Sequence, residues 1–369
     1  MPAVLTVLAC AGIDAPAVAA CLNAARRAFD GDAQRRARAV PTHGGARVHA
    51  YSPVVADACS VRTTIDVTYA VSKGVQGRAD PAVELDFCLI ARQLSALRAR
   101  PLLFWNGSKP NLQAWRSALI RHDGASRGGK AHGMLRGLRK ASDAALRLGF
   151  GGPGPRAAWR PFGTCAVVGG APSLAAARNG AQIDAHDAVF RFNDHPAGGP
   201  YARAVGNRTT LRVLNALYAA ADPPAAVGGR TRGEGEARVL QTCQSGRRIG
   251  AAIERAAADG HARRHLIEPE VYRAFYEHFG SGGLTGAIAV WFALAACSSV
   301  TLYGFSSPCE LGAKYTHYHS AINNMERVQV NTVKVALWTH ALRCAGLVRW
   351  AGPRGGDHWC AAPAEAADT

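Results

Sequence analysis

The sequence has few lysines, few aromatic residues and no closely spaced cysteine pair, and these shortages exclude several classes of protein. Only 6 of the 43 basic residues are lysines, and aromatic residues make up 7% of the 369 residues. No zinc-finger spacing and no RNA-binding aromatic motif occurs, so the usual features of nucleic-acid-binding modules are missing. With 48% hydrophobic and 19% charged residues, the chain can bury a core, which excludes a disordered or fibrous protein. The length fits one large or two modest domains.

The formal charge of +17 comes almost entirely from arginine. One explanation is a general composition bias towards Arg and Ala. The other is an anionic partner, because the planar guanidinium suits phosphate and carboxylate groups. The charge by itself does not decide between them.

The ten cysteines contain no CxxC pair, which excludes a zinc-ribbon or thioredoxin-type motif. They are either small buried apolar residues or members of disulfides formed in an oxidising lumen. Two N-x-S/T triplets begin at Asn106 and Asn207, and they permit glycosylation in a secretory compartment.

The first 27 residues contain an apolar stretch, but Asp14 and Pro16 interrupt it and no basic residue precedes it. A membrane span needs about 20 largely apolar residues, and residues 3–22 nearly meet this requirement. Three interpretations stay open: a signal anchor, a signal peptide or a buried helix. We interpret residues 28–160 as a stem-like variable region that ends in a Gly/Pro-rich linker at 149–161.

Residues 161–369 read as a catalytic domain of the α/β class. Strands are expected at 164–168, 187–193, 209–214, 237–242 and 299–304, and helices after 170 and at 248–259, 285–297 and 321–344. Alternating strands and helices predict a mainly parallel, Rossmann-like sheet with helices on both faces. Ligands bind beyond the carboxyl ends of such strands, so the turns at 169–174, 193–199 and 304–309 should line one cleft.

Two glycine-rich turns are candidates for phosphate binding. The first, VVGGAPSL at 167–174, joins a strand to a helix, where backbone N–H groups and the helix N-terminus favour negative charge. The second, GSGGLTG at 280–286, offers the Ser281 and Thr285 hydroxyls at a helix start. Its alternative is an ordinary loop in which Thr285 caps the helix.

The segment YTHYHS at 315–320 carries two imidazoles and is followed by Glu326. His317 and His319 suit proton transfer near neutral pH, although two exposed loop histidines are the simpler explanation. No third ligand stands at a metal-site spacing. The Asp30-Gly31-Asp32 triplet, which looks like a metal-binding DxD, is interpreted as a chance match, so no metal or other cofactor is expected.

Taken together, residues 163–344 resemble the eukaryotic sialyltransferases, glycosyltransferase family 29. The large motif of that family is matched by CAVVGGAPSL, IDAHDAVFRFNDHP and VGNRTTLRVLN within residues 165–215. The small motif is matched by GGLTGAIAVWFALAACSSVTLYGF at 282–305, and the third motif by His317-Tyr318. The resemblance covers about half of the chain and keeps the order of the family's motifs.

The resemblance implies a GT-A-like variant without a DxD metal site. It implies inverting transfer of sialic acid from its CMP conjugate to a glycan hydroxyl on a glycoprotein or glycolipid. It also implies a Golgi membrane location with type II topology and a lumenal catalytic domain. No nucleic acid is expected as a partner.

The family's site residues can be carried over by position. Cys165 and Cys297 would form a disulfide, and His317 would donate to the departing phosphate. The donor would contact residues in the glycine-rich turns and at strand ends: Gly169, Gly170, Ser173, Asn193, Ser281, Thr285, Gly286, Gly304, Phe305 and Ser306.

The sequence departs from the family pattern in three places. Gly170 stands where the family has Asn, and Ser173 stands at a second Asn-like position. Gly283-Leu284 replaces the usual Pro-Ser/Thr before Thr285. The last motif normally places Glu five positions after its His, but here Asn324 stands five positions after His319 and Glu326 follows two later. We assign His319 as the general base because it precedes Glu326 closely.

Three alternatives to a sialyltransferase stay open. The first is a transferase for another CMP-linked 2-keto sugar such as Kdo. The second is a non-catalytic relative that binds glycans or nucleotides. The third is an Arg-rich nucleic-acid binder, which steep salt-dependent binding would support.

Overall fold

The computed structural model describes residues 13–24, 47–51, 54–56, 59–72, 75–79, 82–100, 113, 138–144, 147–148, 161–221, 237–240, 251–254, 264–280, 285–305, 318 and 330–351. The chain forms two compact units. The first unit consists of Met1–Cys88, Gly170–Leu174 and Tyr303–Thr369, and the second of Leu89–Gly169 and Ala175–Leu302.

The first unit contains an antiparallel sheet built around one long strand, β3 (Ser60–Ser72). The first half of β3 pairs with β2 (Val55–Ala56) and β5 (Ala82–Asp86), and its second half pairs with β1 (Arg47–Tyr51) and β4 (Val75–Ala79). The C-terminal helix α12 (Val330–Cys344) packs against β5. The short strand β12 (Arg349–Ala351) follows it.

A helix at residues 15–24 also belongs to the first unit. Its apolar side chains Ala15, Val18, Ala19 and Leu22 are buried. Cys21 in this helix is bonded to Cys344 at the end of α12. Residues 15–24 thus agree with one of the three interpretations of the N-terminal apolar stretch, a buried helix. Residues 1–12 lie outside the described part. Among the described residues, no helix combines the length and apolarity required to cross a bilayer.

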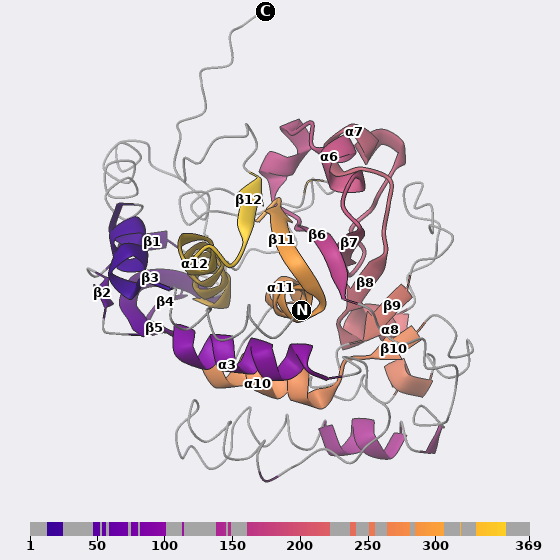
Figure 1. Cartoon of the computed structure of the whole chain (residues 1–369), viewed down its shortest axis with the longest axis horizontal. Helices are drawn as coiled ribbons and strands as arrows, with labels where there is room; N and C mark the ends of the chain where they lie inside the picture. The colour runs from indigo at the N-terminus through magenta and orange to yellow at the C-terminus, as the bar shows by residue number, and fades with distance from the viewer. Residues whose placement is uncertain are drawn as a thin grey trace, which may run out of the picture. The chain divides into compact units, whose positions relative to one another are not determined.

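The second unit contains the predicted parallel sheet (Figure 1). Within this unit its order is β10-β9-β8-β7-β6-β11. The strands are β6 (Phe162–Val168), β7 (Ala188–Phe192), β8 (Leu211–Leu214), β9 (Ala237–Leu240), β10 (Arg264–Leu266) and β11 (Cys297–Tyr303), the last residue of which belongs to the first unit. The neighbours from β10 to β6 are parallel. All five residues of β7 are buried, as expected for a parallel sheet that is covered on both faces.

Two further contacts give the direction of β11. Cys297, at its start, is bonded to Cys165 in β6, and Gly304, just past its end, accepts a hydrogen bond from Ala171 N–H. The two strands therefore run the same way. The predicted α/β class with a mainly parallel sheet is confirmed.

The helix α11 (Thr285–Ala296) packs against β6, β7 and β8. Every residue from Ala287 to Ala296 is buried, which fits a helix that is apolar on all sides. Figure 1 shows α3 (Phe87–Arg98) beside α10 (Pro269–Phe279). Short helices among the described residues include α6 (Gly180–Asp184), α7 (Ala202–Val205), α8 (Ala216–Ala221) and the 3-10 turns η1 (Pro172–Ala176) and η2 (Gly199–Tyr201).

The compact units divide the chain differently from the predicted boundaries at 27/28 and 160/161. Residues 47–86 are not only a variable stem but carry the antiparallel sheet of the first unit. Residues 303–369 group with the N-terminal 88 residues rather than with the rest of the predicted catalytic domain. The Cys21–Cys344 bridge and the packing of α12 against β5 account for this grouping.

Candidate functional site

Asn193 follows β7 at the carboxyl end of the parallel sheet. Its φ of 49° lies in the left-handed region, which Asn adopts more readily than most residues because its short side chain bonds locally. Its N–H donates to Val213 O at 2.9 Å, and its Oδ1 accepts from Asn215 N–H at 3.2 Å. The turn after β7 is thus fixed to the end of β8.

Two arginines fix segments on either side of β8. Arg212 Nη1 donates to the main-chain oxygens of Asn193 and His195, at 3.1 and 2.7 Å, and so orients the turn in which Asn193 lies. Arg191 is fully buried in β7 and donates to Arg208 O and Thr209 Oγ1, in the segment that leads into β8. Sequence reasoning did not single out Asn215, Arg212 or Arg191, although Asn215 directly follows a predicted strand, where ligand-binding residues are expected.

The segment after α7 is fixed by Asp184 at the end of α6. Its carboxylate accepts the N–H groups of Asn207 and Arg208 at 2.8 and 2.9 Å. Asn207, the second glycosylation candidate, is exposed at this position. Glycosylation there stays a prediction, and Asn106 lies outside the described residues.

Three segments that are distant in the sequence meet within the first unit. Ala171 N–H donates to Gly304 O at 2.9 Å, and Tyr318 N–H donates to Gly170 O at 3.1 Å. Gly304 has a φ of 63°, and a Cβ there would lie 2.7 Å from Leu174 Cδ2. The expected proximity of the turns at 169–174 and 304 is therefore present, and Tyr318 of the third motif lies beside them.

The glycine-rich turn at 169–174 differs from its prediction in one respect. It leads into the five-residue 3-10 turn η1 rather than an α-helix, with Pro172 at its first position and Ser173 half-buried. A proline lacks an N–H group, and so short a 3-10 segment has little aligned dipole. The phosphate-binding role predicted for this turn assumed the N-terminus of an α-helix, and no α-helix follows directly here.

The small-motif helix begins as predicted. Thr285 and Gly286 are the first two residues of α11 and are half-buried. The helix ends at Ala296, and the next residue, Cys297, is bonded to Cys165 as the resemblance implied. Arg98 of α3 donates to the main-chain oxygen of Leu294, in the last turn of the helix where helical partners are lacking, and to that of Cys297.

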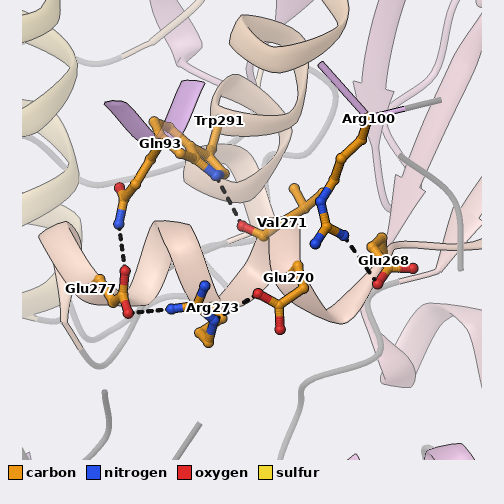
Figure 2. Close-up of polar contacts among 8 residues, drawn as sticks. All are labelled: Gln93, Arg100, Glu268, Glu270, Val271, Arg273, Glu277 and Trp291. Atoms are coloured by element: carbon orange, nitrogen blue, oxygen red, sulfur yellow. Dashed lines mark hydrogen bonds and ion pairs between the residues drawn. The ribbon is translucent and has the colours of Figure 1, made fainter. Parts of the chain in front are cut away.

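An ionic network joins α3 and α10 (Figure 2). Gln93 Nε2 of α3 donates to Glu277 Oε2 at 2.7 Å. Arg273 lies between Glu270 and Glu277 on α10, and its Nε is 2.7 Å from Glu270 Oε2. The network fixes α10 against α3.

The start of α10 carries a perturbed carboxyl group. Burial raises the pKa of Glu268 to about 7, and Arg100, whose Nη1 is 3.4 Å from Glu268 Oε1, partly opposes this shift. Three residues further on, Val271 O accepts the indole N–H of Trp291 at 2.9 Å (Figure 2). That bond connects α10 to the buried helix α11.

Several predicted site residues lie outside the described part of the chain. They are Ser281, Ser306, His317, His319 and Glu326, together with Asp30 and Asp32 of the DxD-like triplet. Of the other donor-site candidates, Phe305 is half-buried with its ring centroid 6.5 Å from that of Trp350, and Gly169 follows β6 directly. The roles of all these residues stay predictions.

Comparison with known proteins finds a match to one family. The sequence model of glycosyltransferase family 29 (sialyltransferase) matches residues 152–245, which include β6, β7 and β8. Over this segment the chain is similar to glycosyltransferase family 29. The match includes Gly169, Gly170, Ser173 and Asn193, whereas Thr285, Gly304 and His317 lie outside it and rest on the motif resemblance.

Curated relatives are similar to part of this chain. "Sialyltransferase-like protein 5" of Oryza sativa subsp. japonica is 28% identical over 195 residues, 53% of this chain and 36% of the relative. "Beta-galactoside alpha-2,6-sialyltransferase 2" of Xenopus tropicalis is 52% identical over 54 residues, 15% of this chain and 10% of the relative. The chain thus spans about a third or less of the length of these two relatives.

A crystal structure of a mammalian sialyltransferase is 18% identical, with a TM-score of 0.46, and the match covers 71% of this chain and 95% of that one.

Proposed function

We propose that this chain is a member of glycosyltransferase family 29 that transfers sialic acid from CMP-sialic acid to a glycan hydroxyl with inversion at the anomeric carbon. The observation that carries the proposal is the pair of main-chain hydrogen bonds that brings Gly170, Gly304 and Tyr318 together. These residues stand in three motifs of the family. In the sequence, Tyr318 stands between the two candidate catalytic histidines. The hydrogen bond from Tyr318 to Gly170 does not by itself require histidines at the two neighbouring sequence positions, 317 and 319.

In the proposed reaction the bond between the sugar's anomeric carbon and the phosphate oxygen breaks, and CMP leaves. The acceptor oxygen bonds to the same carbon from the opposite face, and its proton passes to His319. His317 donates a hydrogen bond to the departing phosphate. Glu326 orients the His319 imidazole. A general base of this kind typically contributes a factor of about 10²–10⁴ in rate.

The donor phosphate is proposed to bind Asn193. Support comes from its position at the carboxyl end of β7 and from the contacts to Asn215 and Arg212 that fix its turn. The N–H groups at the start of α11, beside Thr285 and Gly286, are further candidate donors to the phosphate. A monophosphate leaving group carries less charge than a diphosphate, so hydrogen-bond donors and His317 suffice to stabilise it in a metal-independent reaction.

The test is His319→Ala assayed with CMP-sialic acid and a panel of glycan acceptors. We expect turnover to fall at least ~100-fold while CMP binding, measured by titration calorimetry, stays nearly unchanged. His317→Ala should lower turnover and also weaken donor binding. Lys140→Ala, an exposed substitution on the helix at 138–144, is the control and should leave both unchanged. Full turnover in His319→Ala would refute the assignment of the base.

A second candidate function follows from Gly170. Its main-chain oxygen accepts the Tyr318 N–H, but the residue lacks the side-chain amide that the family places there. The site would then either accept another CMP-linked 2-keto sugar, such as Kdo, or bind the nucleotide without turnover. A donor panel separates the possibilities: turnover only with the Kdo conjugate favours the first, and CMP binding without turnover of any donor favours the second.

We also propose a location in the Golgi lumen. The bonded pairs Cys21–Cys344, Cys59–Cys88 and Cys165–Cys297 fit an oxidising compartment. A type II anchor would have to lie outside the buried helix at 15–24. Localisation of a tagged full-length chain by microscopy tests the compartment, and a purely cytosolic signal would contradict it.

A further inference from the structure

A cluster of potential metal ligands lies in the first unit, in the contact between the helix at 15–24 and α12. His340 and Cys344 are four residues apart on α12, so they occupy one face of the helix. Cys21 comes from the other helix. One ligand atom from each residue, two sulfurs and an imidazole nitrogen, lies within 4.8 Å of the others.

We propose that Cys21, His340 and Cys344 form a zinc site whenever the Cys21–Cys344 bridge is reduced. Two thiolates and one imidazole are ligands that Zn²⁺ prefers, and three protein ligands leave the fourth tetrahedral position to water. In the structure the sulfurs are bonded to each other, which is the oxidised state of the same residues. The bridge and the metal therefore exclude one another.

The geometry of the pair on α12 already suits zinc. His340 Nε2 lies 3.4 Å from Cys344 Sγ. Tetrahedral zinc with ordinary bond lengths holds a nitrogen and a sulfur ligand about 3.6 Å apart, and two sulfurs about 3.8 Å apart. The spacing of His340 and Cys344 therefore needs little change, while the two sulfurs must separate when the bridge opens.

Burial of His340 shields the proposed site from bulk water. Its side chain is 2% exposed. Arg343 places a positive charge near this group. Two thiolates would offset both that charge and part of the charge of the metal.

Cys21 is expected to stay beside α12 without the bridge. Asn23, two residues further along, donates from Nδ2 to Val54 O at 3.3 Å and accepts Val54 N–H at 3.0 Å. Val18 and Leu22 of the same helix are buried. These contacts fix the helix independently of the sulfur atoms, so the ligand set stays assembled in the reduced chain.

The change of state balances chemically. A phosphine and one water molecule convert the disulfide to two thiols: the S–S bond breaks, the water protons go to the sulfurs, and the phosphine becomes a phosphine oxide. Binding of Zn²⁺ then releases both thiol protons. In a newly made chain, zinc would hold α12 against the helix at 15–24 before the bridge forms.

The experiment uses the full chain in the Cys59→Ser/Cys88→Ser background, which removes a different cysteine pair. After anaerobic phosphine reduction, Co²⁺ serves as the spectroscopic probe and Zn²⁺ displaces it. We expect a thiolate-to-cobalt charge-transfer band that the oxidised chain lacks. His340→Gln should weaken Zn²⁺ affinity at least ~10-fold, since loss of a ligand costs no less than loss of its outer partner.

Cys21→Ser and Cys344→Ser should each lower the band, while circular dichroism reports whether the variants fold. An unchanged band in the folded Cys21→Ser/Cys344→Ser double variant would overturn the proposal, because the metal would then lie on other cysteines. If that double variant does not fold, His340→Gln decides: unchanged zinc affinity in it overturns the site.

Discussion

The two compact units of the chain differ in what stabilises each of them internally. The second unit depends on burial: β7 and α11 are almost wholly enclosed, and its Cys165–Cys297 bridge lies within that core. The first unit is assembled from three separated segments of the chain and contains the Cys21–Cys344 bridge, whose residues are 323 positions apart. Nearby segments form a core by packing, whereas closure of a very long loop benefits from a covalent link.

The largest expected effect is in the core of the second unit. Trp291 in α11 is fully buried, so Trp291→Ala should destabilise this unit by about 3–5 kcal/mol. Hydrogen exchange read separately on peptides from β6–β8 and from β3–β5 measures this, with faster exchange expected in β6–β8. Trp291→Phe keeps a ring but loses the bond to Val271 O, and should cost about 1 kcal/mol. Equal acceleration of hydrogen exchange in both sets of peptides would contradict the expectation that Trp291→Ala destabilises the second unit alone.

A pH-dependent effect is expected next, at the start of α10. Burial raises the pKa of Glu268 from its usual 4.5 to about 7, so the ionised group disfavours the folded state above pH 7. Its penalty declines as pH falls from about 7 and is absent below about 4.5, where the carboxyl is protonated in both states. Glu268→Gln should therefore be more stable than the parent chain at pH 8, by roughly 2–3 kcal/mol.

At pH 4.5 the two proteins should be equally stable, as measured by urea denaturation at several pH values. Arg100→Ala is the matched control, since removal of that charge should raise the pKa of Glu268 further. A constant stability difference across this range would contradict the titration of Glu268.

The smallest effect is expected in the first unit, at Gly304. Its φ of 63° strains any other residue, and an added Cβ would meet the Leu174 side chain at 2.7 Å. Because a leucine terminus can move, Gly304→Ala should cost only about 1–2 kcal/mol. Leu174→Ala added to Gly304→Ala should remove the steric clash and so recover the part of the lost stability that the clash causes. A double-mutant cycle measures the coupling between the two residues. Additive effects would show that the two residues do not press on each other.

Local patterns predicted the parallel sheet well. The apolar run before Gly169 forms β6, and the segments before Asn193 and Asn215 form β7 and β8. Each is a short apolar or alternating run bounded by turn residues, which is information contained in neighbouring positions. The disulfide between Cys165 and Cys297 is also present, but only the family resemblance had indicated that pairing.

The antiparallel sheet of the first unit was missed. Val61, Thr63, Ile65 and Val67 alternate as expected for a strand, and this pattern in β3 could have been found. Its partner β4 contains Gly77 and Arg78 within five residues and carries little strand signal of its own. Such a strand forms because β3 offers it hydrogen bonds, which no local pattern records.

The candidate site, too, was predicted only in part from the sequence. The sequence alone determined the motif residues, the strand ends on which Asn193 and Gly304 lie, and the presence of cysteines without any CxxC pair. Only the tertiary structure decided that Asn215 and Arg212 hold Asn193, that Tyr318 bonds to Gly170, and that Cys21 pairs with Cys344. Periodicity and turn chemistry act between neighbours in the chain, whereas the choice of distant partners depends on how the whole chain packs.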